Sequence, residues 1–155
     1  MESTRGRLFV SYGDGLYAAA KDDFQRVVGP LFDFAQQEVV KRGIFLPFGA
    51  ILDADGKMAL HAAAGESELT NSTEILPLLH QGLRASRQSD TLVVAVCEWV
   101  KITPNGGKQT DAVKVLVEHA NGLTVAFYLP MQKKLLGGWQ TDEMMVVPAS
   151  AEVGR

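Results

Sequence analysis

The chain has 155 residues, of which 46% are hydrophobic and 21% charged, and its formal net charge is -3. A chain of this length buries enough surface to fold without disulfides or metals, so we expect residues 1–155 to form a single domain with flexible ends at about 1–7 and 149–155. The clustered Lys and Arg of nucleic-acid-binding proteins are missing, so nucleic acid is not an expected partner. No apolar run approaches the roughly 20 residues of a membrane span, so no membrane association is expected.

Cys97 is the only cysteine, and it stands within an apolar run, where thiols are usually buried and inert. A single cysteine excludes an intramolecular disulfide, which fits a reducing compartment. We therefore expect a cytoplasmic protein with an unreactive thiol.

The first long element predicted by the sequence is a helix over residues 16–42. Its residues are good helix formers, and its apolar side chains recur at helical spacing. Gly29-Pro30 interrupts the pattern, so we expect either a kink or two helices with Pro30 in the first turn of the second. Gly43 is expected to end the helix.

Residues 44–63 predict a β-hairpin. If residues 54–56 form a three-residue loop with Gly56 in the left-handed conformation, Leu52 pairs with Met58. A second helix is expected from Ser72 to about Arg87, because apolar side chains recur there at helical spacing.

Three apolar runs between residues 91 and 129 are joined by the dipeptides Asn105-Gly106 and Asn121-Gly122. Asn-Gly readily adopts the two positive φ angles of a type I′ turn, so each dipeptide predicts a two-residue hairpin loop. The three runs are therefore expected to form an antiparallel meander.

The predicted turns set the register of the meander. The first turn places Val94 opposite Val117 and gathers valines on one face, whereas a slip of one residue would set Val94 against Glu118. The second turn likewise places Val117 opposite Ala126. Both faces of the meander are then largely apolar, so each needs a cover.

Together these elements predict an α+β fold with helices packed on an antiparallel sheet of five to six strands. The order is α-β-β-α-β-β-β, with a possible last strand over residues 141–147. Over residues 16–129 this order resembles Roadblock, longin and other profilin-like modules, in which a five-stranded antiparallel sheet carries helices on its faces. The resemblance implies regulatory or scaffolding work, although the possible last strand departs from the terminal helix common in Roadblock modules.

Neither a cofactor nor a metal is expected. Residues 13–18 match the letters of the glycine-rich dinucleotide fingerprint, but no strand-helix-strand unit surrounds them, so we expect a flexible turn. His61, His80 and His119 fall on a hairpin, a helix and a strand end, without metal-ligand spacing. His119 adjoins a predicted turn and is expected to face solvent.

Glu98 is the most informative polar residue, because the predicted register puts it between Val96 and Val100, where an unpaired carboxylate is costly. One interpretation is that the twist of the sheet carries Glu98 to water or to an Arg. The other is an acid or base with a raised pKa in a pocket near Tyr128 and His61. That pocket would make the protein a small-molecule-binding protein or an enzyme, which is our alternative hypothesis.

On the second face of the predicted meander, Trp99, Leu116, Phe127 and Leu129 form an apolar patch with Lys114 at its rim, as in protein interfaces. The leading hypothesis is therefore a non-enzymatic protein-interaction or regulatory module that forms a homodimer through this patch, with a further protein partner possible. In the competing account, the two helices cover the two faces within one chain.

Overall fold

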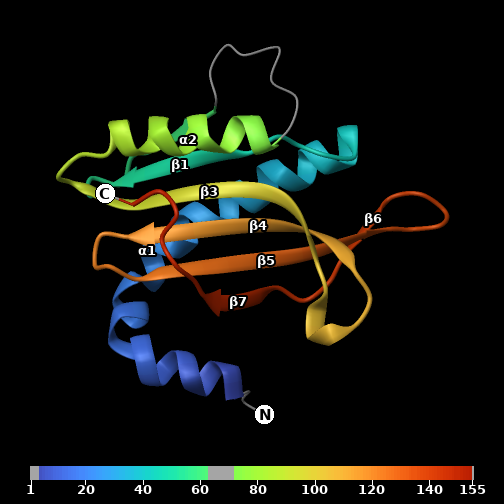
Figure 1. Cartoon of the computed structure of the whole chain (residues 1–155), viewed down its shortest axis with the longest axis horizontal. Helices are drawn as coiled ribbons and strands as arrows, with labels where there is room; N and C mark the ends of the chain where they lie inside the picture. The colour runs from blue at the N-terminus through green and yellow to red at the C-terminus, as the bar shows by residue number, and fades with distance from the viewer. Residues whose placement is uncertain (1–3, 63–71, 155) are drawn as a thin grey trace.

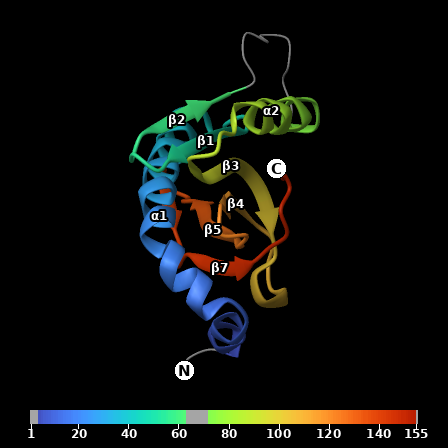
Figure 2. The same cartoon turned by 90° about the vertical axis from the view of Figure 1, so that its left-hand side faces the viewer.

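The computed structural model describes residues 4–62 and 72–154, and for residues 4–14 and Ser72 the description covers the backbone alone. A seven-stranded antiparallel sheet forms the middle of the molecule. Helix α1 lies on one face and α2 on part of the other (Figures 1 and 2). The predicted α+β class and element order are confirmed, with two short strands after the meander.

Helix α1 runs without a break from Thr4 to Arg42. The helix includes Pro30, which has no backbone N–H to donate to the carbonyl one turn earlier. Gly29 and Pro30 face solvent, so water can bond that carbonyl and the helix tolerates the proline. The predicted alternative of two helices is therefore wrong, and so is the turn expected within residues 13–18, which are helical. Gly43 ends the helix as predicted, with φ 80° and an N–H donated to the Val39 carbonyl.

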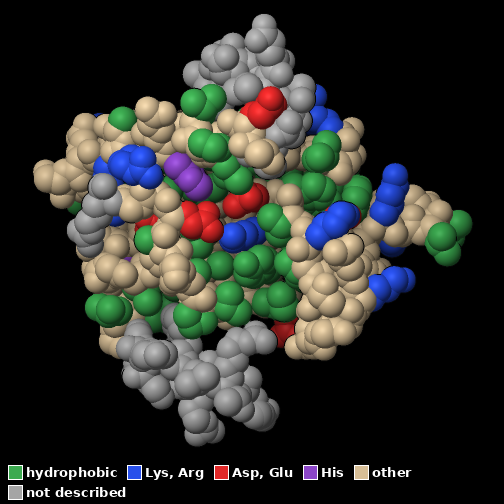
Figure 3. All heavy atoms as spheres, in the orientation of Figure 1, with side chains coloured by type: hydrophobic (Ala, Val, Ile, Leu, Met, Phe, Trp, Pro, Cys, Tyr) green, Lys and Arg blue, Asp and Glu red, His purple; other side chains and the backbone are tan. Residues whose placement is uncertain are grey.

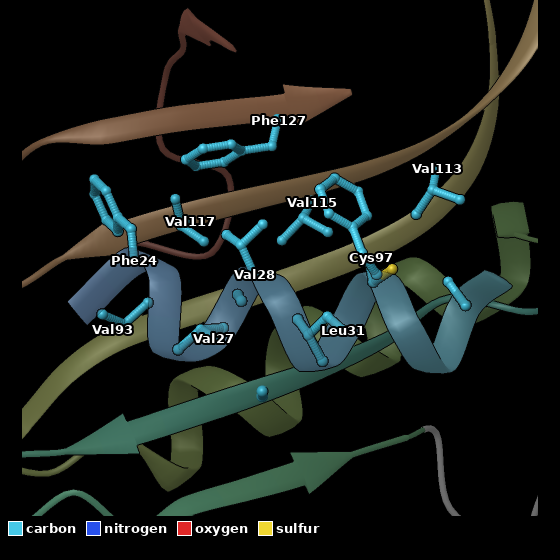
Figure 4. Close-up of a cluster of buried hydrophobic side chains, with 14 of the residues drawn as sticks. Phe24, Val27, Val28, Leu31, Val93, Cys97, Val113, Val115, Val117 and Phe127 are labelled. Atoms are coloured by element: carbon cyan, nitrogen blue, oxygen red, sulfur yellow. The ribbon is translucent and has the colours of Figure 1, made fainter. Parts of the chain in front are cut away.

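The main core lies between α1 and the sheet (Figure 4). One stripe of α1 is buried against alternate residues of the central strands, because side chains on the same face recur every second residue along a strand. The helix contributes Phe24, Val27, Val28, Leu31, Ala35 and Val39, and the sheet contributes Val93, Ala95, Cys97, Val113, Val115, Val117, Val125 and Phe127. Each large side chain buried here contributes roughly 1.5–3 kcal/mol to folding.

Strands β1 (Phe48–Asp53) and β2 (Met58–His61) form the predicted hairpin. Leu52 pairs with Met58, and Gly56 has φ 89°, as the three-residue loop requires. Helix α2 (Ser72–Ser86) follows, and its buried side chains pack on the face opposite to α1.

Gly49 of β1 lets α2 approach the sheet closely. A Cβ at this position would lie 2.6 Å from the Ala95 carbonyl oxygen and 2.9 Å from Leu83 Cδ1. The space beside Gly49 is therefore filled by a leucine of α2.

Strands β3 (Thr91–Ile102), β4 (Thr110–His119) and β5 (Thr124–Lys133) form the predicted meander, but the predicted register between β3 and β4 is wrong. Val94 pairs with Glu118, a shift of one residue. The reason is a longer connection, in which Ile102 pairs with Thr110 and a short 3-10 turn, η1 (Pro104–Gly106), lies between them.

The second turn of the meander shows the same shift. Val117 pairs with Val125 instead of Ala126. The loop has three residues, since the N–H of His119 donates to the Leu123 carbonyl at 2.9 Å, and Gly122 has φ 96°. An Asn-Gly pair thus fits a longer loop as well as a two-residue loop.

The last part of the chain extends the sheet and then crosses it. Strands β6 (Trp139–Thr141) and β7 (Met145–Pro148) both pair with β5. Residues 149–154, which we call the strap, then run from β7 toward α2 (Figure 1). Part of the predicted loose tail is therefore anchored: Val153 is 2% exposed and the backbone of residues 152–154 is hydrogen-bonded to Glu118.

Candidate functional site

Helix α2 covers only part of its sheet face. Its buried Leu79 and Leu83 pack on Ile51, Val94 and Val96, at one end of the face. Figure 3 shows hydrophobic side chains at the surface below a group of acidic, basic and histidine side chains. A large part of this face therefore lies beyond the helix.

We call this region the open half of the sheet. Its centre consists of five partly exposed side chains from three strands: Val100, Ile102, Tyr128, Met145 and Val147. The alternation along β3 and the pairing of β5 with β7 place all five on the α2 side.

The open half carries a small hollow. A hollow of about 190 Å³ is lined by residues that include Ile102, Asn105, Tyr128 and Met145. Pockets for small molecules usually measure roughly 300–1,000 Å³. The hollow over these side chains is thus smaller than a typical small-molecule pocket.

Four titratable side chains meet where α2, the strap and the open half adjoin, and we call them the polar cluster. The Nζ atom of Lys114 lies 3.9 Å from Glu98 Oε2 and 3.6 Å from Glu152 Oε2. His80 Nε2 lies 3.9 Å from Glu152 Oε1 and makes no hydrogen bond within the described part of the chain. One ammonium group therefore lies between two carboxylates at the border of an apolar surface.

Burial raises the pKa of Glu98 above its ordinary value, and Glu152 adds to the shift, while Lys114 and His80 oppose it. The Glu98 side chain is only 12% exposed, and Lys114 lies directly opposite it on β4. The carboxylate thus has a lysine as its partner, in place of the Arg or water expected from the sequence.

The three residues predicted to line a pocket do not converge on one cavity. Tyr128 lines the hollow of about 190 Å³, but neither Glu98 nor His61 does. His61 lies on β2 opposite Gly49, where Leu83 fills the space. The histidine near Glu98 is His80, whose place beside this carboxylate depends on how α2 packs on the sheet.

The residues of the predicted interface patch do not share one face. Trp99, Phe127 and Leu129 lie on the α1 side, whereas Leu116 and Lys114 lie on the α2 side. Phe127 is 6% exposed and Leu116 is 2% exposed. The register shift causes this separation, since moving the pairing by one residue carries a side chain to the other face.

His119 is buried, so the prediction that it faces solvent is wrong. Its Nδ1 accepts the Asn121 N–H at 3.0 Å, so the ring proton is on Nε2, which lies 2.8 Å from Asp23 Oδ2. Both ring nitrogens are thus occupied in joining α1 to the β4–β5 turn.

Cys97 is fully buried in the core under α1. Burial, with a smaller contribution from the charge of Glu98, raises the pKa of the thiol well above its ordinary value. The sulfur is therefore held as a thiol, which is a poor nucleophile.

Comparison of the chain with protein-family models, curated proteins and solved structures finds no match. The resemblance to profilin-like modules accordingly rests on the order of the elements. Neither described helix is long and apolar enough to cross a membrane. Within residues 4–62 and 72–154 there is also no group of three side chains placed to hold a metal ion.

Proposed function

We propose that the protein is a non-enzymatic interaction module that forms a homodimer through the open half of its sheet. The observation that carries this proposal is the group of five partly exposed apolar side chains on a regular sheet surface, bordered by the polar cluster. An apolar centre with a polar rim is the usual anatomy of a protein interface.

The positions and partners of the titratable side chains support a binding protein rather than an enzyme. His119 uses both ring nitrogens within the fold, and Cys97 is buried as a thiol. Glu98 has Lys114 as its partner and lies outside the hollow that contains Tyr128. These groups hold elements together and do not point into a shared cavity.

A second copy of the chain suits the open half better than a strongly charged partner. The centre of this surface is uncharged, and the nearest charges, Glu98 and Lys114, already face each other. A two-fold contact brings the same patch of both copies together, so an apolar surface is its own complement. The proposed role is regulatory or scaffolding work, which rests on the resemblance to profilin-like modules. The proposed cytoplasmic location rests on the single buried thiol.

Light scattering and circular dichroism on two matched variants test this proposal. Val147→Glu puts a charge at the centre of the open half, where its own copy repels it across a two-fold axis, so a folded monomer is expected. Leu136→Glu makes the same kind of change at a fully exposed position outside this surface and should leave the dimer intact. Equal molar masses for the two variants would contradict the proposed interface.

A further inference from the structure

The strap is held by side chains of other elements in a manner that resembles a bound peptide. The backbone N–H groups of Glu152, Val153 and Gly154 donate to the carboxylate of Glu118 at 2.8, 2.8 and 3.0 Å. Successive backbone N–H groups that surround one anion form a strong set of charge-assisted hydrogen bonds.

The carbonyl groups of the strap also have side-chain partners. Arg84 Nε donates to the Val153 carbonyl at 2.8 Å, and Arg87 Nη1 donates to the Gly154 carbonyl at 2.8 Å. Side chains of Glu118, Arg84 and Arg87 thus bond both the N–H and the C=O groups of residues 152–154, which do not join the sheet.

Three positions of the strap make distinct contacts. Val153 is 2% exposed and lies in an apolar site that includes Leu79, Leu83 and Val96. The Glu152 carboxylate lies 3.6 Å from Lys114 Nζ. Gly154 has φ 74°, a conformation that favours glycine.

We propose that this groove is a peptide-binding site, which the strap fills as an intramolecular ligand. Its intermolecular partner is a protein segment with an acidic residue, then a small aliphatic residue, then glycine. The acid would face Lys114, the aliphatic side chain would fill the apolar site, and the glycine would permit the left-handed turn. The inference does not rest on the proposed homodimer, because the groove lies under the strap and not in the open half.

The groove does not depend on the strap for its construction. Within the described part of the chain, the groups that pack on Val153 or bond the backbone of residues 152–154 lie on β1, β3, β4 and α2, and at Arg87 just after α2. At the start of the strap, the Ala149 N–H donates to the Thr124 carbonyl of β5 at 3.1 Å. When the strap leaves, Glu118 still has Arg87 at 3.9 Å, so its carboxylate is not left without a cation. Val153 is the one fully buried apolar side chain of residues 149–154, and a segment with few buried apolar contacts can open while the rest of the fold persists.

Fluorescence anisotropy on the full-length protein tests the inference with a labelled, amidated peptide of residues 148–154 (PASAEVG). Val153→Asp should release the strap, because a carboxylate cannot occupy the apolar site, and the peptide should then bind at least about tenfold more tightly than to the wild type. The control Ala151→Asp changes an exposed neighbour and should bind like the wild type. A peptide with Asp in place of its valine should bind to neither.

A second variant covers the case in which Val153→Asp does not fold by circular dichroism. Val153→Ala weakens the anchor without adding charge and should give an intermediate gain in peptide binding. Folded Val153 variants that bind no more peptide than the wild type would overturn the proposal. A molar mass that halves on Val153→Asp without peptide binding would also overturn it, since it would assign the groove to the strap of a second copy.

Discussion

Val94 of β3 lies directly opposite Glu118 of β4, so a carboxylate that is 4% exposed is placed beside a fully buried valine. The sequence argues against this pairing, because an unpaired carboxylate in such a place is costly. The strap removes the cost by donating three backbone N–H groups, and Arg87 adds a guanidinium at 3.9 Å. The strap therefore supplies hydrogen bonds to a carboxylate that the β3–β4 register places at a buried position.

The first prediction concerns this carboxylate. Glu118→Ala should lower the free energy of unfolding by about 3 kcal/mol, because it leaves three N–H groups and the Arg87 guanidinium without their acceptor. Glu143→Ala, at an exposed position, should change stability by less than about 0.5 kcal/mol. Urea denaturation measures both, and equal losses for the two variants would show that the strap contributes little.

The second prediction concerns the close approach of α2 to β1. Gly49→Ala should destabilise the fold by about 2 kcal/mol or more, since the added methyl group would lie 2.6 Å from the Ala95 carbonyl oxygen. Gly82→Ala in α2 is the matched control, because a Cβ there meets nothing within 4 Å, and it should stabilise the helix by roughly 0.5–1 kcal/mol. The two substitutions should shift the thermal denaturation midpoint in opposite directions. A shift in the same direction for both variants would refute the predicted contact.

The third prediction is a pH dependence at Glu98. Burial raises its pKa, so between the ordinary and the raised value the folded chain holds a proton that the unfolded chain has lost. Stability therefore falls as pH rises through this interval, and at neutral pH the full cost of burying the charge remains. Glu98→Gln removes that charge and should raise the denaturation midpoint at neutral pH.

The gain from Glu98→Gln should shrink as the pH falls toward about 4, where wild-type Glu98 is protonated as well. Thermal melts of both proteins across this pH range check the trend. Glu143→Gln serves as the exposed control and should show no such trend. A gain that grows on acidification would contradict the assigned direction of the pKa shift.

The fourth prediction is that Cys97 does not react in the folded protein. The side chain is fully buried and its pKa is raised, so a thiol reagent should label it only after unfolding. In a Ser150→Cys variant, the added thiol at an exposed position should react at once, giving one labelled group per chain. Two groups labelled rapidly under native conditions would show that the core is open near Cys97.

Local sequence determined some of these features and not others. The β1–β2 register follows from a three-residue loop with one left-handed glycine, and residues within the hairpin suffice to predict it. The β3–β4 register cannot be predicted from its turn in the same way. Asn105 and Gly106 have the predicted positive φ angles, but they lie within a longer connection. The three N–H groups that donate to Glu118 lie 34 to 36 residues further along the chain.

The polar cluster was equally hard to predict. Glu98 is identified by its place in an apolar strand, but its neighbours come from α2, β4 and the strap. The positions of His80 and Glu152 depend on how a helix and a chain end pack on the sheet. No pattern local to either residue specifies that packing.

Sedimentation equilibrium of the wild-type chain at tens of micromolar tests the central claim most directly. A homodimer formed through the open half predicts a molar mass twice the 16.8 kDa of one chain, falling toward that value on dilution. A mass of one chain throughout this concentration range would contradict the proposed homodimer.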